Sequence, residues 1–109
     1  MPIKAMAKSD YDFVVIGAGA GGLTAARFAA RLGARVALVE RDRIGGDCTW
    51  TGCVPSKSLI RVAKAAHEIR TAQRFGIVAD GFDVQMEQVR AYIQGKVRQI
   101  YEPTTPEAL

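Results

Sequence analysis

The chain has 109 residues, of which 49% are hydrophobic and 24% charged, and its 15 basic and 11 acidic side chains give a formal charge of +4. This composition is typical of an ordinary globular protein with at most one domain. The basic residues are spread along the chain rather than clustered among aromatic residues, so no nucleic-acid partner is expected. No apolar run is long enough to cross a bilayer and no secretory signal precedes Asp10, so we expect no membrane partner and a cytoplasmic location.

The first forty residues predict a strand–helix–strand unit. Two short β-branched and aromatic runs indicate buried strands, and the alanine-rich segment between them indicates a helix that lies close to a sheet. In chain order we expect a flexible leader at residues 1–9 and a βαβ unit at residues 11–40, made of a strand at Tyr11–Ile16, a helix at Gly21–Leu32 that Gly33 ends, and a strand at Val36–Val39.

The remaining residues predict a glycine-rich loop followed by two helices. Pro55 suits a first helical turn, and apolar residues at helical spacing follow it. The predicted fold class is therefore α/β, although two parallel strands make a poor sheet by themselves. The expected features are a loop with two cysteines at residues 45–57 and a helical pair at residues 55–102, with a first helix that fades near Phe75–Gly76, a turn at Asp80–Gly81, and a last helix that Asp83 caps.

The segment from Gly17 to Gly22 matches the pattern G-x-G-x-x-G between the first strand and the helix. In such a turn Gly17 allows the tight bend, Gly19 lets a pyrophosphate approach the backbone, and Gly22 lets helix and strand pack closely. The helix N-terminus offers unpaired N–H groups to phosphates. The pattern predicts a dinucleotide-binding turn, with an ordinary strand–turn–helix as the alternative.

Glu40 lies 18 residues past Gly22, at the end of the second predicted strand. A carboxylate at this position can accept hydrogen bonds from both ribose hydroxyls, and it repels a 2′-phosphate. We therefore expect Glu40 to disfavour NADP in this site; the alternative is a solvent-exposed Glu40 without a ligand.

Cys48 and Cys53 lie five positions apart in a glycine-rich loop that leads into a helix. A helix start favours thiolate over thiol, and Lys57 adds positive charge one turn further on, so the pattern predicts a lowered thiol pKa. Gly52 lets the chain bend tightly enough to bring the sulfurs together. The segment predicts a thiol pair that exchanges with its disulfide in a reducing compartment.

Three other interpretations of the cysteines fit the sequence less well. Inert buried cysteines would not need glycines on both sides, and a thioredoxin-like module would use C-x-x-C. A zinc site needs four ligands, and the only further candidate, His67, lies well down the next helix. We therefore expect no metal site, and we expect His67 to be an ordinary residue of the helix surface.

The run G-G-x-C-x-x-x-G-C-V-P-S-K, after G-x-G-x-x-G and a strand-end glutamate, resembles the class I pyridine nucleotide–disulfide oxidoreductases. That family includes dihydrolipoamide dehydrogenase, glutathione reductase and mercuric reductase. The resemblance runs from Tyr11 through Lys57 and more loosely to the end of the chain. Asp47 stands where threonine is usual and Trp50 where asparagine is usual, which favours a mercuric-reductase-like or uncharacterised branch.

The resemblance implies FAD as the cofactor, NAD(P)H as co-substrate, a small-molecule disulfide, dithiol or Hg(II) as substrate, and a homodimer. It implies Cys53 as the charge-transfer thiol against the flavin ring, Cys48 as the interchange thiol that meets the substrate, and Lys57 near flavin N5. The catalytic residues implied are Cys48 and Cys53, and the cofactor-binding residues implied are Gly17, Gly19, Ala20, Gly22, Glu40, Arg41, Gly45, Gly46, Asp47, Cys48 and Lys57.

Members of that family are several times longer, so residues 1–109 are interpreted as the N-terminal part of an incomplete, Rossmann-like, three-layer FAD-binding domain. Such a part is expected to hold FAD weakly and to turn over no substrate by itself. The alternative is a stand-alone nucleotide- or flavin-binding module with a thiol switch and no turnover.

Overall fold

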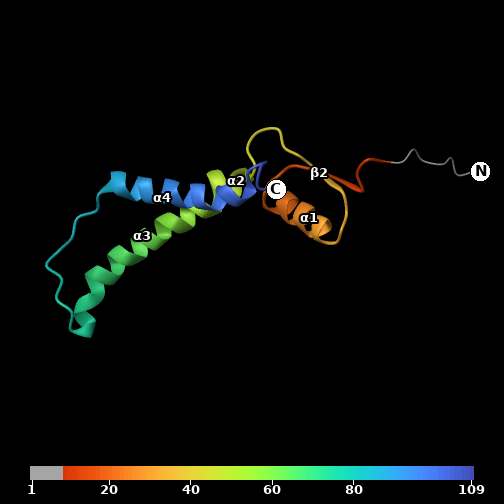
Figure 1. Ribbon diagram of the computed structural model, residues 1–109. Helices are drawn as coiled ribbons and strands as arrows, with labels where there is room; N and C mark the ends of the chain where they lie inside the picture. The colour runs from red at the N-terminus through yellow and green to blue at the C-terminus, as the bar shows by residue number, and fades with distance from the viewer. Residues whose placement is uncertain (1–8) are drawn as a thin grey trace, which may run out of the picture. The chain divides into compact units, whose positions relative to one another are not determined.

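The computed structural model describes residues 9–109 and divides into two units, the first ending at Gly46 and the second beginning at Asp47 (Figure 1). The leader expected at residues 1–9 lies outside the described residues apart from Ser9. Over residues 9–109, no helix has the length and apolar character needed to span a membrane. The α/β class and the βαβ unit followed by helices are confirmed.

The first unit is the predicted βαβ motif. It consists of strand β1 (Phe13–Ile16), helix α1 (Ala20–Arg31) and strand β2 (Val36–Val39). The strands pair in parallel, with Phe13 opposite Val36 and Ile16 opposite Val39. Helix α1 packs on both strands, and its alanines allow this approach because they add little bulk to the contact.

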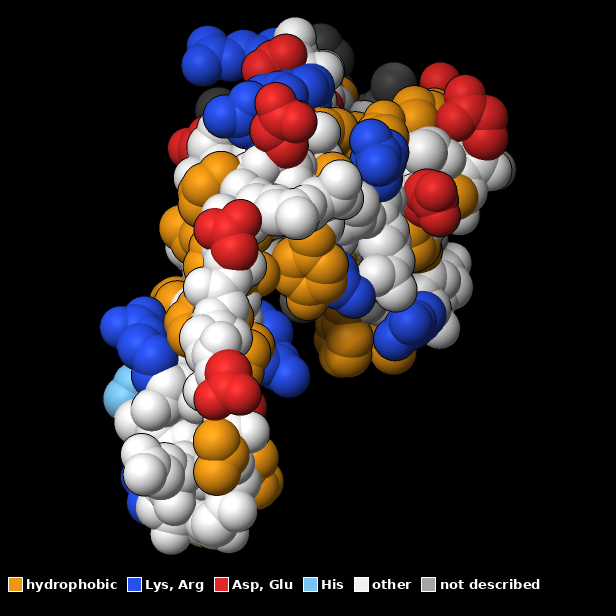
Figure 2. Space-filling view, turned by 90° about the vertical axis from the view of Figure 1, so that its left-hand side faces the viewer, with side chains coloured by type: hydrophobic (Ala, Val, Ile, Leu, Met, Phe, Trp, Pro, Cys, Tyr) orange, Lys and Arg blue, Asp and Glu red, His pale blue; other side chains and the backbone are white. Residues whose placement is uncertain are grey.

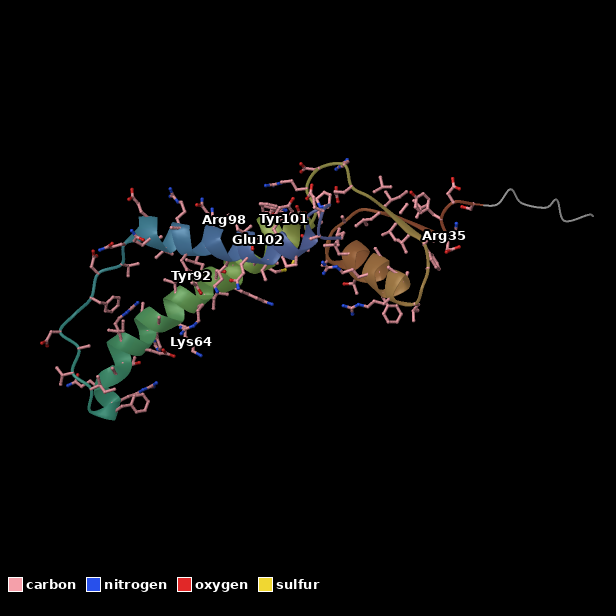
Figure 3. All side chains as sticks on the ribbon, in the orientation of Figure 1. Arg35, Lys64, Tyr92, Arg98, Tyr101 and Glu102 are labelled. Carbon is pink, nitrogen blue, oxygen red and sulfur yellow. The ribbon has the colours of Figure 1, made fainter. Side chains whose placement is uncertain are left out.

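Asp12 and Arg35, which directly precede the two strands, are joined by an ion pair and hydrogen bonds. The Arg35 side chain, labelled in Figure 3, lies 3.3 Å from Asp12 Oδ1, and the Arg35 backbone N–H donates to Asp12 Oδ2 at 2.8 Å. The Asp12 backbone N–H donates to the Arg35 carbonyl at 2.8 Å. These bonds lower the pKa of Asp12, because the Arg35 backbone N–H and guanidinium both favour the carboxylate.

The strands are not buried as expected. Val14 is 61% exposed and Ile16 85%, and Phe13 is also mostly exposed. A parallel sheet buries its strands only when helices cover both of its faces. Within residues 9–46, the described part of the first unit, α1 is the one long helix and can cover one face, so the apolar side chains of β1 remain at the surface.

The second unit is a helical pair with the cysteine segment at its start. Helix α3 (Cys53–Thr71) continues into a 3₁₀ turn at Ala72–Phe75, and α4 (Met86–Tyr101) continues into a second 3₁₀ turn at Glu102–Thr104. Helices α3 and α4 lie side by side (Figure 1). The apolar stripe predicted on the last helix is confirmed at its centre, since Val89 and Val97 are buried. Many other hydrophobic side chains stay at the surface (Figure 2).

Two local expectations for this unit are wrong. The segment expected as loop contains a short helix, α2 (Gly46–Trp50), because this segment closes a helical turn in which the Thr51 N–H donates to the Asp47 carbonyl at 3.0 Å. Asp83 does not cap α4: the N-cap residue is Gln85, and no side chain there makes a capping hydrogen bond. Helix α4 begins at Met86, so Asp83 lies too far upstream to reach the first turn.

Candidate functional site

The glycine turn (residues 17–22) joins β1 to α1. Gly17 has a φ of +99°, which a side-chain-bearing residue rarely adopts. A Cβ atom at Gly22 would overlap the carbonyl oxygen of Gly17, so the third glycine permits the close approach that the sequence predicted. A Cβ at Gly17 or Gly19 would instead meet open space. Gly19 is the N-cap of α1 and no side chain caps this terminus, so its N–H groups are not taken by a capping side chain.

Gly45 and Gly46 return to the glycine turn within the first unit. The Gly45 N–H donates to the Ala18 carbonyl at 2.8 Å. A Cβ at Gly46 would lie 3.0 Å from the Cα of Gly19, and Gly46 has a φ of +60°. The structure thus places the Gly45–Gly46 pair against the glycine turn. The sequence had only assigned both groups to the same expected cofactor.

Glu40, directly after β2, faces the same turn. Its Oε2 accepts a hydrogen bond from the Ala18 N–H at 2.7 Å, and its Oε1 accepts bonds from the N–H groups of Arg41 at 2.8 Å and Asp42 at 3.1 Å. These backbone donors, first that of Ala18, lower the pKa of Glu40 because they stabilise the carboxylate. A carboxylate offers about four acceptor positions, so a ribose hydroxyl can still donate to it.

The first unit fits the phosphate and ribose end of a dinucleotide. Open space lies beside Gly17 and Gly19, the adjoining N-terminus of α1 has no side-chain cap, and a carboxylate stands at the end of the neighbouring strand. Backbone N–H groups and a helix N-terminus attract phosphate oxygens, and a strand-end carboxylate suits ribose. Ala20 and Arg41 lie beside these groups in the chain and are exposed, and their contacts to a cofactor stay predictions.

The thiol pair (Cys48 and Cys53) occupies the start of the second unit. Cys48 lies in α2 and is half-buried, whereas Cys53 is the first residue of α3 and is exposed; both are free thiols. A hydrogen bond from the Cys48 thiol to the Cys53 side chain raises the pKa of Cys48, and burial and the charge of Cys53 raise it further. The expected lowering is therefore wrong for Cys48. Lys57 acts in the predicted direction, since its charge lowers this pKa, but its influence is smaller.

Two contacts hold the segment that carries the thiol pair. Trp50, at the end of α2, packs against Tyr101 of α4 with ring centroids 5.0 Å apart and planes tilted by 55° (Figure 3 labels Tyr101). Gly52 lies so close to the preceding turn that a Cβ there would be 2.9 Å from the Asp47 carbonyl oxygen and 3.5 Å from the Cys48 Cα. The role expected for Gly52, bringing the two cysteines together, is consistent with this approach. Asp47 itself lies in the first turn of α2.

Replacing Gly52 by alanine is expected to separate the two cysteines. The new Cβ would press on backbone atoms that cannot rotate away, at a cost of about 1–3 kcal/mol of unfolding free energy, and intramolecular disulfide formation should slow severalfold. Gly95→Ala in α4 is the matched control: its Cβ meets open space, and it should stabilise the helix by about 1 kcal/mol. Urea unfolding and the rate of thiol loss under mild oxidation measure both effects. Equal thiol-loss rates in the two variants would contradict the role given to Gly52.

Acid is expected to weaken the first unit. Asp12 and Glu40 both have pKa values below their ordinary values of 3.8 and 4.5. A lowered folded-state pKa stabilises the fold above the unfolded pKa and loses that contribution as pH falls through the folded pKa. Resistance to urea, measured by circular dichroism, should therefore stay level from about pH 7 to 5 and decline below about pH 4.5. Asp12→Asn and Glu40→Gln should each flatten this decline, whereas Glu68→Gln on the exposed face of α3 should not.

Sequence reasoning missed two residues of this region. Ala18 is fully buried, and its N–H and carbonyl both form hydrogen bonds. The one sequence signal for this role was its position inside a glycine-rich turn. Tyr101 supports the segment that carries the cysteines, and its aromatic partner Trp50 was noted only as an unusual residue. His67 lies exposed on α3, as expected.

The site and the fold define a protein class. Residues 11–105 match the family described as pyridine nucleotide-disulphide oxidoreductase. Because the match covers most of the chain, this chain belongs to that family.

Among curated relatives, the chain is 40% identical over 89 residues to a dihydrolipoyl dehydrogenase of Bacillus subtilis, with 82% of this chain and 19% of the relative covered. It is 47% identical over 89 residues to that of Haloferax volcanii, with 82% of this chain and 18% of the relative covered. It is also 47% identical over 74 residues to that of Chlamydia trachomatis, with 68% and 16% covered. The chain thus spans less than a fifth of the length of the curated relatives it matches.

Proposed function

We propose that residues 11–57 supply the FAD-binding turn and the redox-active thiol pair of a flavoprotein disulfide oxidoreductase. The observation that carries this proposal is the pair of free thiols, Cys48 and Cys53, with Gly52 packed against the Cys48 backbone, directly after two glycine groups that pack together. Family membership and the dihydrolipoyl dehydrogenase relatives support it.

In this proposal the cofactor-binding residues lie between Gly17 and Lys57. Gly17, Gly19, Ala20 and Gly22 bind the phosphates through the backbone of the glycine turn. The list is completed by Glu40 and Arg41 at the ribose, by Gly45, Gly46 and Asp47 along the pyrophosphate and flavin side, and by Cys48 and Lys57 near the flavin. When bound at these residues, FAD would supply the two-electron chemistry that links NAD(P)H to the thiol pair.

The thiol pair performs the exchange with substrate. A thiolate of a dithiol substrate attacks the sulfur of Cys48 in the disulfide form, and Cys53 leaves as a thiolate. The second substrate thiol then displaces Cys48, so the substrate becomes a disulfide and the pair becomes a dithiol that carries two electrons and two protons. The reverse sequence reduces a disulfide substrate. The dihydrolipoyl dehydrogenase relatives favour a lipoyl-type dithiol as the substrate, and Hg(II) is the other proposed substrate. The intact enzyme is further proposed to be a cytoplasmic homodimer.

Nucleotide binding to the 109-residue protein tests the proposal. FAD titrated into the chain should show saturable binding, followed by quenching of flavin fluorescence, and ADP should compete. ADP carrying a 2′-phosphate should compete at least about tenfold more weakly, because Glu40 repels the added charge. Failure of FAD to bind saturably, or equal competition by the two nucleotides, would count against the site. NADH-dependent reduction of lipoamide by the chain alone is not expected.

A further inference from the structure

Both backbone polar groups of Ala18, its N–H and its carbonyl, form hydrogen bonds within the protein. Ala18 has no exposed surface, and its N–H donates to Glu40 Oε2 at 2.7 Å. Its carbonyl accepts from the Gly45 N–H at 2.8 Å. Because both backbone groups are satisfied within the protein, the orientation of the second residue of the glycine turn is fixed without any ligand.

The carboxylate that holds Ala18 is itself fixed. Glu40 Oε1 accepts hydrogen bonds from the N–H groups of Arg41 and Asp42, which begin the segment leading to Gly45. One side chain therefore connects the turn after β1 with the segment after β2. The positive charge facing it comes from Arg41, and Asp42 adds a negative charge close by.

We infer that Glu40 is a positioning residue, which assembles the glycine turn and the Gly45–Gly46 pair into their nucleotide-receiving arrangement before any nucleotide arrives. This role rests on the proposed function for its purpose and goes beyond the ribose contact expected of Glu40. A site assembled in advance loses less conformational entropy on binding, so the same contacts give a higher affinity.

Glu40 can support nucleotide binding in two ways, by contacting ribose or by positioning the glycine turn, and loss of affinity for ADP alone does not distinguish them. If Glu40 acts only on ribose, its replacement weakens nucleotides that carry the 2′ and 3′ hydroxyls and leaves others unaffected. If it positions the turn, its replacement also weakens a nucleotide that lacks both hydroxyls. Glu40→Gln removes a negative charge, which alone would favour an anionic ligand, so any loss of affinity cannot come from charge.

Hydrogen exchange in the free protein is the first measurement. In the wild-type chain, the Ala18 amide should be protected to a similar degree as the Gly17 amide, which donates to the Val39 carbonyl at 2.7 Å. In Glu40→Gln, the Ala18 amide should exchange at least about tenfold faster and the Gly45 amide severalfold faster. The Gly17 amide should change less than about twofold, as should all three in the control Glu68→Gln.

Affinity is the second measurement. ADP and 2′,3′-dideoxy-ADP should both bind Glu40→Gln at least about fivefold more weakly than they bind the wild type. Unchanged binding of the dideoxy nucleotide would overturn the inference. So would an unprotected Ala18 amide in the wild type, a result that needs no folded variant. If neither nucleotide binds the wild type, the proposed function fails, and the exchange rates alone then decide the positioning role.

Discussion

Replacing Gly22 by alanine is expected to disrupt the first unit and to remove nucleotide binding. The added Cβ would overlap the Gly17 carbonyl oxygen, and neither partner can move without shifting β1 or α1. Overpacking costs about 1–3 kcal/mol when flexible side chains can adjust, and here both partners are backbone, so we expect a loss at or above the upper end of that range. Urea unfolding followed by circular dichroism, and FAD binding, measure the two effects.

Gly21→Ala is the matched control for this prediction. Gly21 is adjacent in the same helix, but a Cβ there meets nothing within 4 Å. Alanine in a helix has a lower backbone-entropy cost than glycine, so this variant should gain about 0.5–1 kcal/mol of stability and bind FAD as the wild type does. Similar behaviour of the two variants would show that the close approach at Gly22 does not control the turn.

Oxidised glutathione is expected to convert the thiol pair into an intramolecular disulfide. A cysteine thiolate attacks the glutathione disulfide and releases one glutathione thiol, and the second cysteine then displaces the other. Because Gly52 packs against the backbone of Cys48 and the Cys53 thiol is near enough to raise the pKa of Cys48, the mixed disulfide should be short-lived. Mass spectrometry should find the wild-type chain two protons lighter, with glutathione adducts at least about tenfold rarer than in the single variants.

Cys48→Ser and Cys53→Ser are the controls for the disulfide. Each retains one thiol and can only accumulate a glutathione adduct. A wild-type chain that carries two glutathione groups, without the intramolecular disulfide, would contradict the proximity of the two thiols.

The βαβ unit could be predicted because its signals are local. The β-branched runs, the alanine-rich helix and the glycine pattern each follow from neighbouring residues, and Val36–Val39 has the predicted bounds. The exposure of β1 could not be predicted in the same way. It depends on how many helices cover the sheet, and an apolar run such as Phe13–Ile16 looks the same whether or not they are present.

Two features of the candidate site depend on side-chain contacts that the sequence pattern does not show. Glu40 was expected near a ribose, but its hydrogen bond to Ala18 joins residues 22 positions apart and required the return of the chain after β2. The thiol pKa was predicted from the helix start and the charge of Lys57. In the structure, Cys48 lies in a five-residue helix, and the neighbouring Cys53 thiol raises its pKa by more than the charge of Lys57 lowers it.

The order in which iodoacetamide labels the two cysteines most directly tests our proposal that the glycine turn and the thiol pair serve one flavin. Without FAD, limiting reagent at pH 7 should label Cys53 first, because Cys53 is exposed while Cys48 is half-buried and has a raised pKa. With saturating FAD, Cys53 should become protected and Cys48 should be labelled first, whereas Gly22→Ala, which should not bind FAD, keeps the original order. Labelling of Cys53 at the same rate with and without bound FAD would contradict the claim.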